Sequence, residues 1–283
     1  MIDVIKDTLF DSIKLLPFLF LAYLLMEYLE HKTGNKTKDI VKKSGKLGPL
    51  WGGIIGIFPQ CGFSAAAANL YAGKIITMGT LIAVFLSTSD EMLPILISEA
   101  APASLILKIL AIKLAVGIIA GFIIDLVINV IGKTKKVEPE EAVGHMCEHD
   151  HCDCEHGIFK SALKHTINIF IFITIITFAI NTLIHFIGEE TIEKAIAGVP
   201  VLGILVSSIF GLIPNCAGSV IITELYLSNL ISFGSMIAGL LVGSGIGILV
   251  LFKSNKNIKE NLTITGLLML VGIIVGLIID FVI

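Results

Sequence analysis

Two short stretches place chemically versatile residues inside apolar segments of the chain. The first is IFPQCGFS at 57–64 and the second is LIPNCAGS at 212–219. Each offers an amide and a thiol beside a proline, together with backbone carbonyls that the proline leaves without a helical partner. Amide and carbonyl oxygens combined with thiolates form a mixed hard and soft ligand set, which suits a transition-metal ion or a thiophilic metalloid.

Hydroxyl groups follow both stretches at helical spacing. Positions 216, 219 and 223 are separated by three and four residues, so they share one helical face, and position 64 repeats the first step after position 61. A single membrane cysteine is usually a small apolar filler, but the duplicated Pro-x-Cys with an amide at x favours a site. The predicted substrate-binding residues are Pro59, Gln60, Cys61, Ser64, Pro214, Asn215, Cys216, Ser219 and Thr223.

Carboxylates mark a second break, STSDE at 87–91. Intramembrane carboxylates are costly and functional by default, so we predict that Asp90 and Glu91 bind the cation or couple transport to protons. Alternatively, Thr88 begins a capping-box pattern in which Glu91 only satisfies the start of the next helix. Glu224 is a weaker coupling candidate, near the end of the segment that follows the second Pro-x-Cys.

Asp125 and Asp280 have a different expected role. Each lies a few residues from the end of an apolar segment, and we expect it to face water or to cap a neighbouring helix. The glycines that precede them form G-x-x-x-G patterns, which typically allow close helix packing.

A polar tract, HMCEHDHCDCEH at 145–156, is dense in imidazole, thiol and carboxyl groups. Its spacing is not that of a folded zinc finger, so we predict a flexible tract that binds metal loosely. A merely polar linker would explain the acids but not the density of histidine and cysteine. The predicted ligands are His145, Cys147, His149, His151, Cys152, Cys154 and His156.

The elements that carry these residues are membrane helices. The chain is 55% hydrophobic and only 15% charged, with a mean hydropathy of +0.94, which indicates a multi-pass integral membrane protein. Predicted spans of suitable length lie at 9–29, 75–97, 105–131, 167–187, 230–252 and 262–283. All 20 basic residues are lysines, which argues mildly against anionic substrates, and nothing indicates a nucleic-acid surface.

The chain is an internal duplication. A shift of 155 positions, from 61 to 216, superimposes the two halves without a gap. GIIAGFIID at 117–125 likewise matches GIIVGLIID at 272–280. The pairs that carry the match include Gly56/Gly211, Pro59/Pro214, Cys61/Cys216, Ser64/Ser219, Tyr71/Tyr226, Gly79/Gly234 and Ser89/Ser244.

Lysine distribution predicts that the halves are inverted. The loop at 32–46 is rich in lysine, whereas its counterpart at 188–194 is acidic, and the bias reverses at the loop after the third segment. The predicted fold is all-α, with two inverted-topology repeats of three spanning helices and one re-entrant hairpin each, broken at the Pro-x-Cys tip. The predicted units are repeats at 1–131 and 161–283, joined by a metal-binding linker at 132–160. Four parallel crossings per half would place the lysine-rich linker outside, so we prefer the hairpin.

These motifs resemble the ten-transmembrane heavy-metal exporter family, also labelled manganese transporter or arsenic-efflux-like permease. The resemblance rests on GIFPQCGFSAAAANLYAGK at 56–74, STSDEMLPI at 87–95, GLIPNCAGSVIITELY at 211–226 and the His/Cys-rich linker. It implies export of a toxic or excess metal across the cytoplasmic membrane, with ten spans if each re-entrant arm counts as one. It also implies a site at 59–61 and 214–216, with positions 90 and 91 beside it.

The leading hypothesis is a transporter rather than an enzyme. It exports a divalent metal, manganese favoured, by alternating access around the two tips in exchange for protons, since the chain has no G-x-x-x-x-G-K-[ST] loop. The alternative is arsenic or antimony efflux with Cys61 and Cys216 as thiolate ligands. A thiol oxidoreductase that cycles the same cysteines is less favoured, because neither lies in a C-x-x-C motif.

The expected partners follow from this hypothesis. They are the lipid bilayer of the cytoplasmic (inner) membrane and a metal ion as substrate, with zinc, iron, cadmium or arsenic as alternatives to manganese. No prosthetic group is expected, and a homodimer is left open.

Overall fold

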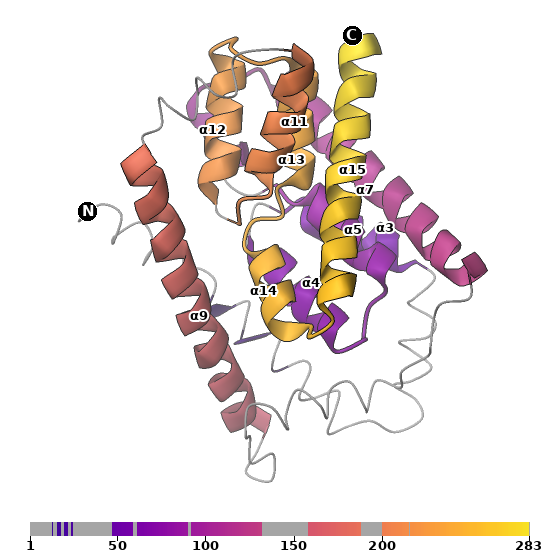
Figure 1. The fold of residues 1–283 in the computed structure, drawn as a ribbon, viewed down its shortest axis with the longest axis vertical. Helices are drawn as coiled ribbons and strands as arrows, with labels where there is room; N and C mark the ends of the chain where they lie inside the picture. The colour runs from indigo at the N-terminus through magenta and orange to yellow at the C-terminus, as the bar shows by residue number, and fades with distance from the viewer. Residues whose placement is uncertain are drawn as a thin grey trace.

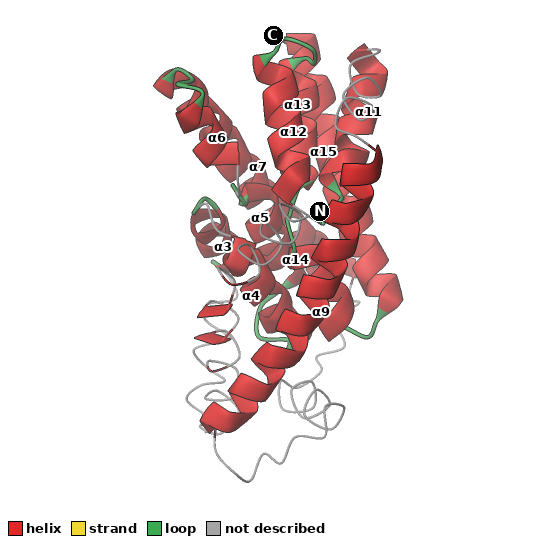
Figure 2. Cartoon of the chain, turned by 90° about the vertical axis from the view of Figure 1, so that its left-hand side faces the viewer, coloured by secondary structure: helices red, strands yellow, loops and turns green. Residues whose placement is uncertain are grey.

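The structure is a computed structural model of the chain. It describes residues 47–58, 61–89, 92–131, 158–187, 200–214 and 216–282, together with a few positions of the first apolar segment. These residues form helices and no strand, as the predicted all-α class requires. Figures 1 and 2 show the short central helices flanked by longer ones.

The two halves contribute matching series of helices. A shift of 155 positions maps α4 onto α12 and α5 onto α13 residue for residue, so the duplication is visible in the helix boundaries. The first half contains α3 (Gly48–Gly56), α4 (Cys61–Ala72), α5 (Met78–Ser87), α6 (Met92–Ser98) and α7 (Ala103–Ile131). The second half contains α9 (Ile158–Ile187), α11 (Pro200–Gly211), α12 (Cys216–Leu227), α13 (Phe233–Val242), α14 (Gly247–Ser254) and α15 (Ile258–Val282).

Within the described residues, four helical stretches are long and apolar enough to cross a membrane: Met78–Ser98, Ala103–Val130, Phe233–Ser254 and Ile258–Val282. The spans predicted at 75–97 and 230–252 fall on the first and third of these. Each consists of two short helices, α5 with α6 and α13 with α14, rather than one continuous helix. The span predicted at 167–187 lies within α9, and most of the span predicted at 9–29 lies outside the described residues.

The interrupted stretches form the interior, and the continuous ones face outward. About three quarters or more of Met78–Ser98 and Phe233–Ser254 is buried (75% and 83%), against 22% for each of the other two. Along α7 and α15, apolar side chains such as Leu126 and Ile278 are exposed. Such surfaces suit contact with lipid, whereas the interior helices need partners within the protein.

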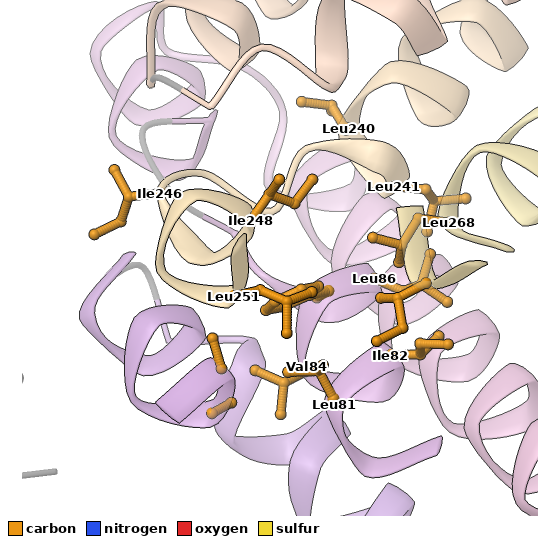
Figure 3. Packing of buried hydrophobic residues seen from close by; sticks show 14 of the residues in the cluster. Leu81, Ile82, Val84, Leu86, Leu240, Leu241, Ile246, Ile248, Leu251 and Leu268 are labelled. Atoms are coloured by element: carbon orange, nitrogen blue, oxygen red, sulfur yellow. The ribbon is translucent and has the colours of Figure 1, made fainter. Parts of the chain in front are cut away.

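The halves meet through a shared apolar core. Figure 3 shows Ile82 and Leu86 of α5 beside Leu241 of α13 and Leu268 of α15, and all four are buried in one cluster. Because α5 and α13 are repeat equivalents, this contact joins the centres of the two repeats.

A carboxylate caps the start of the interior helix in each half. Asp125 near the end of α7 accepts hydrogen bonds from the Gly79 amide (2.8 Å) and the Thr77 hydroxyl (2.7 Å) at the start of α5. A negative charge there satisfies free amides and complements the helix dipole. The prediction that these acids cap neighbouring helices is confirmed. In the second half, Asp280 accepts the equivalent bonds from Ser232 (2.5 Å) and Gly234 (2.7 Å).

Glycines make this contact possible. A Cβ atom at Gly79 would overlap the Gly121 carbonyl oxygen, and one at Gly234 would overlap the Gly276 carbonyl oxygen. The G-x-x-x-G patterns therefore serve close helix packing, as predicted.

We expect Asp125→Ala and Asp280→Ala each to lower the free energy of unfolding by about 1–3 kcal/mol, because each leaves a helix start without its charged acceptor. Thermal unfolding of the purified protein in detergent measures this. Leu126→Ala, at an exposed neighbouring position, is the control. Equal melting temperatures for Asp125→Ala and the control would contradict the assigned role of the cap.

Candidate functional site

The Pro-x-Cys motifs each separate two short helices. Cys61 is the first residue of α4 and Cys216 the first residue of α12, so both motifs interrupt the chain where the proline was expected to break it. Pro214 is half-buried and lies in the turn that follows α11. The remaining predicted residues of the two tips, Pro59, Gln60 and Asn215, and the side chains of both cysteines lie outside the described part of the structure.

The hydroxyl residues that follow the tips point into the protein. Ser64 and Thr223 are fully buried, and Ser219 is half-buried. The Thr223 hydroxyl donates to the Ser219 carbonyl one turn earlier (2.7 Å), so it is already used within α12. Glu224, the next residue, is exposed and therefore lies on another face of the helix from Thr223.

Each half packs one of its short helices against a short helix of the opposite half. Helix α4 of the first half lies along α14 of the second, and α12 of the second lies along α6 of the first. The helices that begin at Cys61 and Cys216, α4 and α12, thus contact the short helix that follows the break in the central span of the other repeat, α14 and α6 respectively.

Two hydroxyls bond carbonyls in the last turn of α5, just before the break between α5 and α6. The Thr88 hydroxyl donates to the Val84 carbonyl (2.7 Å), and the Ser87 hydroxyl donates to the Ala83 carbonyl (2.7 Å). The Thr88 hydroxyl thus donates to the end of the preceding helix, while the capping-box alternative concerns its oxygen as acceptor from residue 91 and stays a prediction. The carboxylates Asp90 and Glu91 lie outside the described residues.

An ammonium group satisfies the equivalent break in the second half. Positions 242 and 243, which replace Ser87 and Thr88, are valine and glycine and have no hydroxyl. Nζ of Lys113, on α7, donates to the Leu240 carbonyl near the end of α13, whereas the equivalent Phe85 carbonyl accepts from the Thr88 backbone amide. Lys113 is 1% exposed. The sequence reasoning missed it, although a lysine in the interior of an apolar span, opposite a leucine in the repeat, is a detectable signal.

A polar network ties the end of α4 to the start of α15. The Tyr71 hydroxyl and the Lys74 ammonium both donate to Glu260, with 3.1 Å between Nζ and Oε1. The Asn255 amide reaches the other carboxylate oxygen (3.4 Å) and the Asn261 side chain (2.8 Å). These groups come from different repeats, so they join the halves at one end of the α4–α14 contact.

The same end of the α4–α14 contact has a further hydrogen bond that has no equivalent at the α12–α6 contact. The Ser254 hydroxyl donates to the Asn69 side-chain oxygen (2.7 Å). The repeat equivalents of these residues are Glu99 and Glu224, both acidic and both exposed. Two carboxylates repel rather than pair, so the α12–α6 contact lacks this bond.

A glycine lets α14 approach α4 closely. A side chain at Gly247 would come within 2.8 Å of Phe85 and 2.9 Å of the Ser64 Cβ. Its repeat equivalent in α6 is Met92, a large buried side chain. The two cross-repeat contacts are therefore different by sequence, with the closer approach encoded at Ser64.

A cluster of metal ligands is not found within the described ranges, where no group of three His, Cys, Asp or Glu side chains is close enough to hold an ion. The predicted ligands His145–His156 of the linker lie outside those ranges. The interrupted helices are the candidate functional site, because they hold non-helical backbone and polar side chains inside an apolar interior.

Comparison with known families decides the class of protein. The profile of the family described as "Putative, 10TM heavy-metal exporter" matches residues 1–186 and 158–283. The chain belongs to this family. The resemblance inferred from the motifs is thus confirmed, whereas neither a curated protein nor a solved structure gives a match. Membership of this exporter family, with the apolar helices described above, identifies a membrane protein.

For this member of the exporter family, we expect Gly247→Ala to lower the free energy of unfolding by about 1–3 kcal/mol, because the new methyl group would overlap Phe85 and Ser64. Gly266→Ala on α15 is the matched control, since nothing lies within 4 Å of the point that its new Cβ atom would occupy. That change should be neutral or stabilise by about 0.4–1 kcal/mol. Melting temperatures in detergent compare the two, and an unchanged value for Gly247→Ala would refute the close approach.

Proposed function

We propose that the chain is a secondary-active exporter of a transition or heavy-metal cation, with manganese favoured, in the cytoplasmic (inner) membrane. The observation that carries the proposal is the duplicated set of interrupted helices, one break at Pro-x-Cys and one within the central span of each half. Secondary transporters hold ions at such breaks, where the backbone leaves carbonyl and amide groups available near the bilayer midplane. Family membership supports export of a heavy metal.

In this proposal the repeats are inverted and the Pro-x-Cys tips are re-entrant. Helix α3 has 9 residues and α4 has 12, which at about 1.5 Å per residue gives roughly half of a 30 Å hydrocarbon core. Inversion is supported by the opposite courses of two equivalent helices: α7 runs down to the lower right of Figure 1, whereas α15 runs upward to the C-terminus. The lysine bias points the same way.

Alternating access is supported by the cross-repeat packing. If the α4–α14 and α12–α6 contacts separate in turn, the interior between the tips opens first to one side of the membrane and then to the other. Here the α4–α14 contact is held by the close approach at Gly247 and by the network around Glu260. The α12–α6 contact lacks both features at its equivalent positions, so it is the one proposed to open in this state.

The ligands at the tips separate two candidate substrates. Manganese prefers oxygen, so its binding would depend on the amide oxygens of Gln60 and Asn215 and on the nearby carboxylates. Arsenite or antimonite would depend on the thiolates of Cys61 and Cys216. We favour manganese because oxygen donors outnumber sulfur donors in both motifs, while the metalloid remains the alternative. The linker at 132–160 would collect the metal on the cytosolic side.

The substrate is tested by uptake into everted membrane vesicles across manganese, zinc, iron, cadmium and arsenite, with and without an inwardly acidic pH gradient. We expect gradient-driven manganese uptake. Replacing Gln60 and Asn215 together by alanine should reduce it about 10–100-fold, because loss of oxygen ligands worth about 1–3 kcal/mol lowers affinity by that factor.

The matched control is the double change Cys61→Ser and Cys216→Ser. It should keep manganese uptake within about twofold, because serine replaces the thiol by a hydroxyl of similar size and leaves the amide oxygens that manganese prefers in place. If this variant loses manganese uptake while the amide variant keeps it, thiolates select the ion and the metalloid alternative is preferred. If none of the five ions moves, export of these ions is not the function.

Alternating access is tested with two equivalent cysteine pairs, introduced after Cys147, Cys152 and Cys154 are replaced by serine. The pair at positions 69 and 254 should form a disulfide readily without metal, because the native side chains are within hydrogen-bonding distance (2.7 Å). The pair at 224 and 99 should cross-link less. Transported metal should raise the second yield at the expense of the first.

Single-cysteine variants at each of the four positions control for pairing with Cys61 or Cys216. Trapping the 69–254 disulfide should stop metal uptake, and reduction should restore it. Full uptake with that disulfide in place would show that the α4–α14 contact does not need to open.

A further inference from the structure

Lys113 lies deep in an apolar span. It is the eleventh residue of α7 (Ala103–Ile131), so it lies about 15 Å along the helix at about 1.5 Å per residue, near the middle of a hydrocarbon core of about 30 Å. Its side chain is 1% exposed. A charged group at that depth is costly and usually serves ion or proton movement.

The ammonium group contacts a broken helix end. In a continuous helix the Leu240 carbonyl would accept from the amide of residue 244, but α13 ends at Val242 and the carbonyl accepts from Lys113 Nζ instead. Carbonyls at a helix C-terminus carry partial negative charge. In transporters such ends, together with unwound backbone, coordinate the driving cation.

A second observation in the same break points to a ligand. The Ser244 hydroxyl is 1% exposed and has no hydrogen-bond partner within the described part of the chain. It follows Gly243 directly and precedes Gly245, whose φ is 54°. The break thus combines a helix-end carbonyl, an unused hydroxyl oxygen and non-helical backbone, which are the elements of a small oxygen-lined cation site.

The lysine is present in one repeat only. Its equivalent is Leu268, which packs in the apolar core beside α5. The Phe85 carbonyl, which is the repeat equivalent of the Leu240 carbonyl, accepts from the Thr88 backbone amide (3.3 Å). The Lys113 ammonium at the α13–α14 break is therefore specific to the second half of the structure and is not needed at the equivalent break between α5 and α6.

The charged groups near Lys113 can be named for the described part of the chain. Helices α3 and α5, which pack on α7, and α13, which Lys113 reaches, have no titratable side chain among their residues. On α7 itself, Lys108 is placed over the Phe233 ring (4.6 Å) and Asp125 caps α5. Asp90 and Glu91, at the equivalent break of the first repeat, lie outside the described residues.

We propose that the α13–α14 break is a second cation site of the transporter, which Lys113 fills in the state seen here, and that Lys113 carries the proton exchanged for the metal. This rests on the proposed export function. Arrival of a metal cation in the interior disfavours a second positive charge close by. One N–H bond of the ammonium breaks, its electron pair stays on Nζ, and the proton passes to water on the cytosolic side. When the metal leaves on the other side, Nζ is protonated again from that side.

The test uses the full-length protein reconstituted in liposomes, with manganese as the probe. Lys113→Leu, which copies the other repeat, and Lys113→Arg, which keeps a charge that does not leave, should both lose accumulation driven by a pH gradient by at least about tenfold. Both should keep manganese exchange at equal pH. Lys108→Leu, on the same helix and exposed, should keep both activities.

A second measurement separates coupling from a structural role. Manganese added to the purified protein in weakly buffered detergent should release about one proton fewer per molecule from Lys113→Leu than from the native chain. Equal proton release, or gradient-driven accumulation that survives in both Lys113 variants, would overturn the proposal. If the native protein neither exchanges nor accumulates manganese, the proposed substrate fails instead, which is a different outcome.

Discussion

The need to satisfy backbone polar groups in an apolar interior shapes this structure. The helices of each half are interrupted twice, and every interruption leaves backbone carbonyls or amides without water as a hydrogen-bond partner. Nearby side chains meet that need: hydroxyls at the end of α5, an ammonium at the end of α13, and carboxylates at the starts of α5 and α13. The polar residues at the breaks thus stabilise the fold and also provide chemically active groups in the interior.

The interior position of the interrupted helices follows from the same need. Continuous helices such as α7 and α15 satisfy their own backbone and can face lipid, whereas α5 with α6 and α13 with α14 require protein on all sides. Packing of α4 on α14 and α12 on α6 supplies that surrounding. In this duplicated chain, each repeat therefore supplies helices that pack against the interrupted helices of the other repeat.

Much of this arrangement could be predicted from the sequence, because proline and the repeat are strong local signals. The breaks at Pro59 and Pro214, the helix boundaries repeated at 155 positions and the caps at Asp125 and Asp280 all follow from residue type and spacing. The cross-repeat bonds could not be predicted. Neither the pairing of Tyr71 and Lys74 with Glu260 nor the bond from Lys113 to Leu240 has a local pattern, since the partners lie more than 100 positions apart.

In the proposed transport cycle, the different residues at Gly247 and Met92 would affect the affinity measured from each side of the membrane. If the contacts at one side of the membrane favour one access state, the other access state is the minor one at rest. A ligand that binds only this minor state then finds few molecules that can bind it. Its apparent dissociation constant rises by the inverse of that fraction. An identical set of ligating atoms would then bind the same ion with unequal strength from the two sides, without any change at the atoms themselves.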